Sequence, residues 1–191
     1  MTKSDHELIA DYQNGDSKAL EILFERYKKP VLNFALRVTG NRADAEDVVS
    51  EVMMILLVKK EKYQPTAKFS TWLFTIARNS CINKLRKRKN IFSMWMQNSE
   101  NGEYEVLDLP DTGALPDHLI KEKEMTAQVK KAIEKLPDTQ REALVLREYQ
   151  NLSYEEIRQI LNCSLENVKI LIFRARERLR QELSSFMTEG S

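Results

Sequence analysis

Apolar residues recur every three or four positions along most of this chain, which is the spacing of one face of an α-helix. The clearest stripe lies near the C-terminus and consists of Val168, Leu171, Ile172, Ala175 and Leu179. Runs of β-branched residues are scarce, and the 191 residues include only five glycines and five prolines. The sequence therefore predicts an all-α protein.

One segment interrupts this pattern and divides the chain. Residues 93–117 have no sustained apolar period and are rich in Asn, Ser, Gly, Asp and Pro, which is typical of a flexible linker. We therefore expect two small helical domains, residues 1–92 and residues 118–191. In the first, a long helix capped by Ser70 or Thr71 ends in a basic run near residue 90, where the aperiodic stretch begins.

The second domain carries the pattern of a helix-turn-helix. One predicted helix begins at Ser153, where Glu156 three residues later completes a capping box. It ends at Asn162, a residue type that tolerates a left-handed turn. The next helix begins after Ser164 and is long and basic. Two helices joined by so short a turn are typical of DNA-binding proteins.

Charge is distributed unevenly, although the net charge is only +1. Residues 1–90 hold 17 basic and 11 acidic side chains, residues 91–128 hold 2 and 8, and residues 129–191 hold 11 and 10. The low net charge of the whole chain thus conceals a basic front domain, an acidic connector and a balanced rear domain.

Several classes of protein are excluded by what the sequence lacks. No stretch approaches the roughly 18 apolar residues of a membrane span, and the start has no apolar core like that of a signal peptide. We therefore expect a cytoplasmic protein. Cys81 and Cys163 share no metal-ligand spacing with His6 or His118. Without a phosphate-binding loop or a paired nucleophile, we expect no enzyme, no metal and no cofactor.

The last predicted helix carries apolar residues on its polar face. Ile170 and Phe173 fall opposite the buried stripe, between Lys169 and Arg174. A helix entering a major groove needs this mixture, because cations bind phosphates and apolar groups contact thymine methyls. Alternatively, both residues pack on another helix of the same domain. The predicted duplex-binding residues are Arg158, Glu166, Asn167, Lys169, Ile170, Phe173 and Arg174.

The long helix of the first domain combines aromatic and basic residues. Phe69, Trp72 and Phe74 lie at its start, and Arg78, Lys84, Arg86, Lys87, Arg88 and Lys89 follow. Such a combination suits single-stranded nucleic acid, through base stacking and phosphate neutralisation. Alternatively, the aromatic residues belong to the core, and the basic run is a solvated helix end that complements the helix dipole.

A third stretch, residues 44–57, carries an acidic stripe. Asp44, Asp47 and Glu51 share one helix face, which Met54 continues. Acids leading into an adaptable apolar residue can dock a basic partner helix. A solvated helix face is the simpler alternative.

Together, four stretches resemble the extracytoplasmic-function (ECF) sigma factors of bacterial RNA polymerase. In order, they are NRADAEDVVSEVMMILL, FSTWLFTIARNSCINKLRKRK, LPDTQREALVLREYQNLSYEEI and ENVKILIFRARERLRQEL. The resemblance implies a first domain that binds core polymerase and opens the −10 promoter element, and a second that reads the −35 element as duplex. It also implies contacts with the β′ clamp coiled coil and the β flap, and an anti-sigma factor as a partner.

The same resemblance assigns roles to particular residues. Asp44, Asp47, Glu51 and Met54 correspond to the clamp contact. Residues 63–69 correspond to a loop that captures a flipped base, with Asn79 in the capture pocket. The residues implied for the −10 strand are Tyr63, Lys68, Phe69, Arg78, Asn79, Lys84, Arg86 and Arg88. The acidic linker would pass through the polymerase cleft, although a plain solvated tether remains the alternative.

This chain also departs from the family pattern at the helix-turn-helix. Asn162 stands where the family often has glycine, Arg158 where a small residue is common, and Ile170 where a polar residue is common. A different class of protein therefore stays open: a stand-alone helix-turn-helix regulator that binds duplex DNA as a dimer without polymerase.

Overall fold

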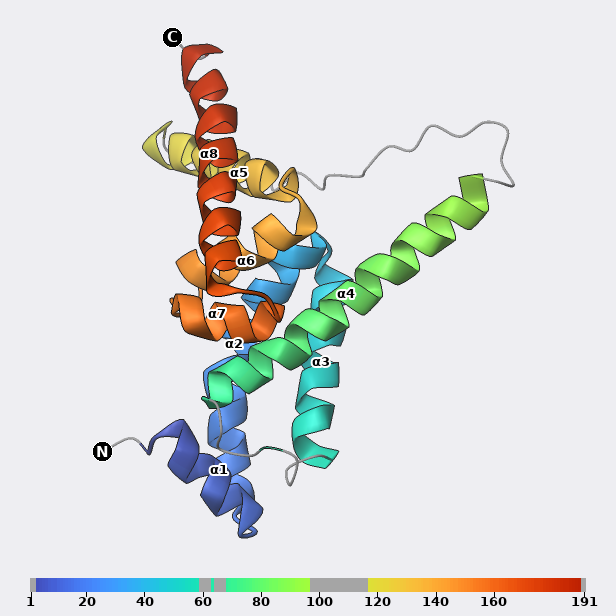
Figure 1. Ribbon diagram of the computed structural model, residues 1–191, viewed down its shortest axis with the longest axis vertical. Helices are drawn as coiled ribbons and strands as arrows, with labels where there is room; N and C mark the ends of the chain where they lie inside the picture. The colour runs from blue at the N-terminus through green and yellow to red at the C-terminus, as the bar shows by residue number, and fades with distance from the viewer. Residues whose placement is uncertain (1–2, 59–62, 64–67, 97–116, 190–191) are drawn as a thin grey trace.

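The computed structural model describes the chain except for residues 1–2, 59–62, 64–67, 97–116 and 190–191. The described residues form eight α-helices and no strand (Figure 1), so the all-α prediction is confirmed. The helices are α1 (Asp5–Gln13), α2 (Ser17–Thr39), α3 (Arg42–Val58), α4 (Phe69–Met96), α5 (Asp117–Glu134), α6 (Asp138–Glu148), α7 (Tyr154–Leu161) and α8 (Leu165–Glu189).

Local signals set the helix boundaries in the front half, α1–α4. The Ser4 hydroxyl accepts a hydrogen bond from the Glu7 amide, and the Glu7 carboxylate accepts one from the Ser4 amide, so a capping box begins α1. Gly40 ends α2 in a left-handed conformation with φ of 66°. The Asn41 side chain then accepts from the Asp44 amide and begins α3, as its sequence position suggests.

The rear half, α5–α8, contains the predicted helix-turn-helix. Ser153 and Glu156 form a second capping box at the start of α7. Asn162 follows α7 in a left-handed conformation with φ of 51°, which asparagine adopts more readily than most side chains. The Ser164 hydroxyl accepts from the Asn167 amide in the first turn of α8. Asn162 and Ser164 thus form the short turn that joins α7 to α8.

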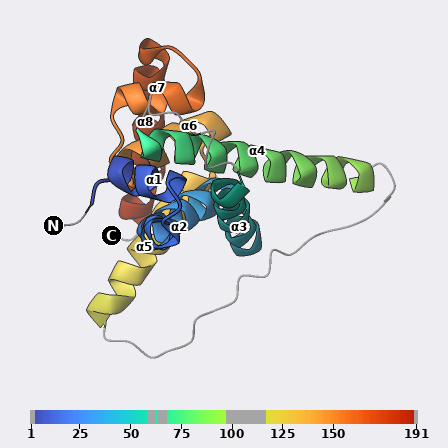
Figure 2. The ribbon, with the colours of Figure 1, turned by 90° about the horizontal axis from the view of Figure 1, so that it is seen from below.

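The front and rear halves lie directly against each other. Helix α4 crosses α7, and α2 contacts both α5 and α6 (Figures 1 and 2). Buried side chains of both halves belong to one continuous hydrophobic cluster, from Leu8 in α1 to Ala175 in α8. The chain therefore adopts a closed arrangement in which the rear half covers part of the front half.

Helix α4 differs from the expectation in length. It continues to Met96 and does not end near residue 90, because nothing in the basic run breaks a helix. Its last turns project away from the rest of the molecule (Figures 1 and 2), and Ile91 and Phe92 are exposed. The remainder of the predicted linker, residues 97–116, lies outside the described residues.

Candidate nucleic-acid and polymerase interfaces

The outward face of α8 presents the residues that the sequence indicates. Ile170 and Phe173 are 46% and 65% exposed, whereas Val168, Ile172 and Ala175 on the opposite side are buried. Glu166, Asn167, Lys169 and Arg174 are also exposed. Neither Ile170 nor Phe173 is buried in the core, so the alternative of packing within the domain is not what the structure shows.

Arg158, one of the departures from the family pattern, and Leu171, on the inner side of α8, are both half-exposed. Arg158 lies on α7, and its guanidinium pairs with Glu155 one turn earlier, a side chain that is also exposed. Leu171 is half-buried and packs against the hydrophobic cluster, as its position in the helical period indicates.

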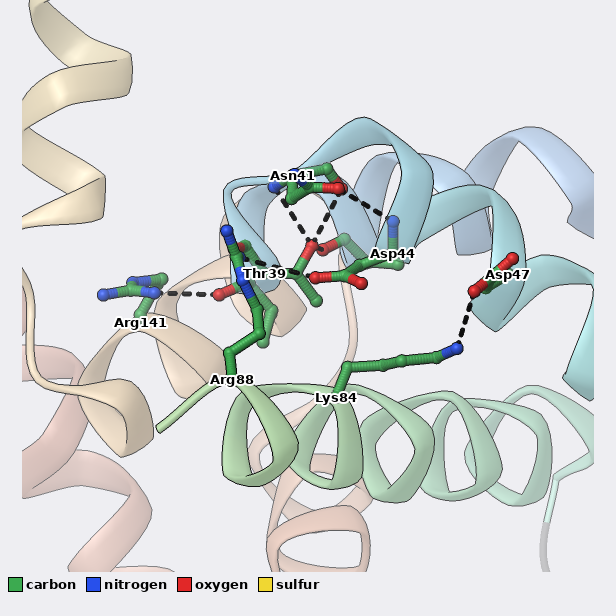
Figure 3. Close-up of polar contacts among 9 residues, drawn as sticks. Thr39, Asn41, Asp44, Asp47, Lys84, Arg88 and Arg141 are labelled. Carbon is green, nitrogen blue, oxygen red and sulfur yellow. Dashed lines mark hydrogen bonds and ion pairs between the residues drawn. The ribbon is translucent and has the colours of Figure 1, made fainter. Parts of the chain in front are cut away.

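Lys84, predicted to contact DNA, pairs instead with two acids predicted to contact polymerase. Its ammonium lies 2.7 Å from an Asp47 oxygen (Figure 3). It also lies 3.2 Å from a Glu51 oxygen. The hydrogen bond from Lys84 to Asp47 raises the pKa of the lysine, so it stays charged. Ser80 of α4 also donates a hydrogen bond to Glu51. A polar contact between α3 and α4 thus joins the two predicted sites.

Arg88 also binds within the chain. It donates to the Thr39 carbonyl at 3.2 Å and lies 3.4 Å from an Asp44 oxygen, an ion pair without hydrogen-bond geometry (Figure 3). Thr39 is the last residue of α2, where a cation complements the helix dipole. Arg141 of α6 approaches the same helix end and donates to the Val38 carbonyl at 2.8 Å.

Arg78 forms a buried ion pair that the sequence did not reveal. Its Nε lies 2.7 Å from Glu142 of α6, and the two side chains are 16% and 2% exposed. Burial raises the pKa of the Glu142 carboxyl, and the charge of Arg78 opposes that rise. The only sequence signal was an acid within the apolar run REALVL, residues 141–146. Only 16% of the Arg78 side chain is exposed in this closed arrangement.

Tyr63 and Phe69, predicted to contact the −10 strand, have buried side chains, which corrects the expectation of exposed aromatic contacts. Phe69 packs edge-on against Tyr27 and Tyr63, and Tyr63 also contacts Trp72. Their large apolar rings are stabilised by this packing, so the alternative that the aromatics of the long helix belong to the core describes Phe69 better. Tyr63 lies in the same cluster. Phe74 is likewise buried, against Phe34. Residues 64–67 of the predicted loop lie outside the described residues.

The remaining predicted strand contacts lie on the surface. Asn79 and Arg86 are exposed on α4. Lys68 is exposed as well, and its ammonium lies 3.2 Å from Glu156 of α7. The surface of α4 is therefore divided into cations that face solvent and cations that are paired within the chain.

The acidic stripe of α3 remains accessible in spite of its internal ion pairs. Asp47, Glu51 and Met54 are exposed, and only Asp44 is largely covered. Leu57 and Val58, which the sequence analysis did not single out, are exposed too and extend the apolar end of the stripe. The face therefore offers carboxylates at one end and an apolar patch at the other.

In the part of the chain that the structure describes, no group of three His, Cys, Asp or Glu side chains is placed to hold a metal ion. Over the same residues, no helix is long and apolar enough to cross a membrane.

Comparison with known proteins shows to which family this chain is related. The family model for Sigma-70 region 2 matches residues 23–91, and that for Sigma-70, region 4 matches residues 126–179. The ECF RNA polymerase sigma factor SigW of Bacillus subtilis is 32% identical over 92% of this chain and 94% of its own. The ECF RNA polymerase sigma-E factor of Escherichia coli is also 32% identical, over 91% of each chain.

Solved structures agree with this relationship. The sigma factor RpoE of Bartonella quintana, in complex with the anti-sigma factor NepR, superposes with a TM-score of 0.67 at 27% identity, over 87% of this chain and 98% of that chain. CnrH, in complex with the cytosolic domain of CnrY, shares the fold with a TM-score of 0.71 at 21% identity, over 96% and 99% of the two chains. The chain therefore belongs to the ECF sigma factors of the sigma-70 family.

Proposed function

We propose that this chain directs core RNA polymerase to promoters by reading duplex DNA with its rear half and binding the opened strand with its front half. The observation that carries the proposal is the outward face of α8. Ile170 and Phe173 are exposed between cations on the helix that follows the turn after α7. This arrangement suits a DNA major groove, because the cations can bind the phosphates at its edges and the apolar side chains can contact the bases.

Polymerase binding is assigned to the exposed face of α3. Its carboxylates complement a basic partner helix, and Met54 with Leu57 and Val58 supplies an apolar contact beside them. We assign this face to the β′ clamp coiled coil, as the family resemblance implies. The β flap is the corresponding partner of the rear half.

Strand opening is assigned to α4 and the residues before it. Asn79 and Arg86 are exposed, while Tyr63 and Phe69 support this surface from the core. Unstacking a base costs a few kcal/mol, and tighter binding to the open strand offsets that cost. Opening is then a shift in a binding equilibrium and needs no hydrolysis, catalytic residue or cofactor from this chain. We place this activity in the cytoplasm, where the polymerase and the chromosome are.

An anti-sigma factor is the proposed negative regulator. RpoE of Bartonella quintana, which shares the fold over almost its whole length, was solved with the anti-sigma factor NepR. The exposed apolar and acidic face of α3 is the surface on this chain that a competitor of polymerase would occupy.

One experiment tests the proposal against the stand-alone regulator. Core polymerase, the purified chain and a promoter fragment are mixed, and unpaired thymines are detected by permanganate. We expect reactive thymines near −10 only when both the chain and polymerase are present. Tight, dimeric binding of the chain alone to duplex, with no unpaired bases in the complete mixture, would instead identify a helix-turn-helix regulator.

A further inference from the structure

A pocket that the proposed function does not use lies between α2, α5 and the end of α6. Its volume is about 450 Å³, within the range of roughly 300–1,000 Å³ that is typical of small-molecule sites. The apolar part of its wall consists of Leu36, Met125, Val129, Ile133 and Tyr149. Met125 and Tyr149 are 42% and 39% exposed, and neither belongs to the surfaces assigned to polymerase or DNA. The pocket therefore offers uncovered apolar surface that still has no role.

A row of polar side chains on α2 forms one edge of this pocket. Lys29, Asn33 and Arg37 are four residues apart, so they lie on one face of the helix at successive turns. All three line a second pocket of about 190 Å³. The two pockets share Asn33, Arg37 and Tyr149, and together we call them the α2–α5 groove. The groove is thus apolar at one end and polar at the other.

The two cations of this row have no carboxylate partner. Two other cations of α2, Arg26 and Lys28, each pair with an acid. Neither Lys29 nor Arg37 forms an ion pair with any residue that the structure describes. Arg37 donates one hydrogen bond, from Nη1 to the Asn33 carbonyl at 3.2 Å. A guanidinium has five N–H donors, so most of those on Arg37 remain for a ligand.

The charge of the groove favours an anion. Its lining holds three cations, Lys29, Arg37 and Lys130, and one acid, Glu134. The Lys130 ammonium lies 3.9 Å from a Glu134 oxygen, so the acid is already balanced within the wall. A cleft lined mainly by charges of one sign concentrates ligands of the opposite sign.

We propose that the α2–α5 groove binds a small organic anion, a monocarboxylate with an apolar chain. The carboxylate binds Arg37 and Lys29, and the chain lies along Leu36 and Val129 in the larger pocket. The Arg37 guanidinium stacks over the Tyr149 ring, 3.9 Å from its centroid, which holds the planar fork in one orientation. Such a fork fits a carboxylate through two parallel hydrogen bonds.

A nucleic-acid strand is the competing occupant, because unpaired cations also bind phosphates. A sugar-phosphate backbone would use Lys29 and Arg37 but leave the apolar pocket beside them unfilled. The chain of a carboxylate covers that apolar surface, whose burial is favourable. The carboxylate therefore accounts for both ends of the groove.

Octanoate is the probe that tests the proposal, with the full chain in the absence of DNA and polymerase. Titration calorimetry should show one saturable site, and thermal melting should show a higher Tm, because a ligand of the folded chain stabilises it. Octyltrimethylammonium and 1-octanol keep the chain but lack the negative charge, and acetate keeps the charge but lacks the chain. We expect each of these three to bind at least about tenfold more weakly than octanoate.

A matched pair of variants locates the site. Lys29→Gln and the control Lys18→Gln make the same change in the same helix. Both lysines are exposed and lack an ion pair among the described residues, but Lys18 lines neither pocket. We expect Lys29→Gln to bind octanoate roughly three- to tenfold more weakly than the control. Arg37→Gln should lose at least about tenfold, and the Tm of each variant without ligand shows whether it is folded.

The outcomes decide between the occupants. No saturable binding of octanoate, equal binding of 1-octanol, or equal affinities of the Lys29→Gln and Lys18→Gln chains overturns the proposal. If Lys29→Gln weakens binding of a single-stranded oligonucleotide while octanoate does not bind, the groove is a nucleic-acid contact instead. Because octanoate binding is measured without promoter or polymerase, its failure leaves the proposed function intact.

Discussion

At the scale of single residues, Lys84 shows that a side chain predicted to bind phosphate can also pair within the chain. It is a lysine in a basic helix, but its nearest partners are Asp47 and Glu51. Because these acids belong to the proposed clamp contact, polymerase and Lys84 compete for the same carboxylates. Docking of a basic partner on Asp47 would release Lys84 towards phosphate.

Charge reversal at Asp47 tests the α3 face. Asp47→Lys repels both Lys84 and a basic clamp helix, and we expect at least about a tenfold loss of affinity for core polymerase, since like charges across an interface cost several kcal/mol. Glu46→Lys is the control, because Glu46 is exposed on the same helix and its ion pair among the described residues is with Arg42, one turn away. Pull-down with core polymerase and thermal melting measure the result. Equal recovery of both variants contradicts the assignment.

Ile170 is expected to read a thymine methyl group. A duplex with uracil in place of the contacted thymine loses one buried methyl, which is worth about 0.8 kcal/mol, so we expect about fourfold weaker binding. Ile170→Ala should bind the two duplexes equally. Arg174→Ala should weaken binding to both by the same factor, since a phosphate contact does not sense the base. Fluorescence anisotropy measures the affinities, and no effect of uracil anywhere in the site refutes the methyl contact.

At the scale of helices, a capping box begins two helices that lie in different parts of the molecule. Ser4 with Glu7 begins α1, and Ser153 with Glu156 begins α7. The first box lies far from α8 at the opposite end of the molecule (Figure 1). The second lies at the start of the helix-turn-helix, one short helix before α8.

This duplication gives a matched pair of variants. Ser4→Ala and Ser153→Ala each remove a cap and should each lower the free energy of unfolding by about 1 kcal/mol. Only Ser153→Ala should also weaken binding to a −35 duplex, because a frayed α7 no longer holds α8 at its angle. Urea unfolding and duplex titration check the two effects separately. Equal duplex affinities for the two variants would show that the α7 cap has no part in presenting α8.

At the scale of the whole molecule, the closed arrangement depends on polar contacts between distant segments. Glu142 is the most buried acid among them, and its pKa is raised above the usual value of 4.5 by burial. The folded chain therefore retains a proton on Glu142 at pH values where the unfolded chain has released it. Stability contributed by this group falls as pH rises through that window.

A comparison of native chain and Glu142→Gln isolates this contribution. The difference in unfolding free energy, native minus variant, should decrease as pH rises from 4.5 and become constant above the raised pKa. Urea unfolding at several pH values up to about 8 measures it. A difference that increases with pH would contradict this. It would mean that the Arg78 charge lowers the pKa of Glu142 more than burial raises it.

The sequence by itself determined the helices, their caps and the faces of α8. These features depend on interactions within a few residues, such as the bond between Ser153 and Glu156 or the period that turns Ile170 outward. A spacing of three or four residues carries that information directly. For the same reason the family resemblance could be identified from four short stretches.

Only the tertiary structure decided which cations of α4 are available. Arg78 meets Glu142 across 64 residues of sequence, and Arg141 meets Val38 across 103. No local period encodes such a pairing, because it follows from how one hydrophobic cluster is buried by both halves at once. The sequence fixes the charges along the chain, and packing of the two halves determines which of them face water.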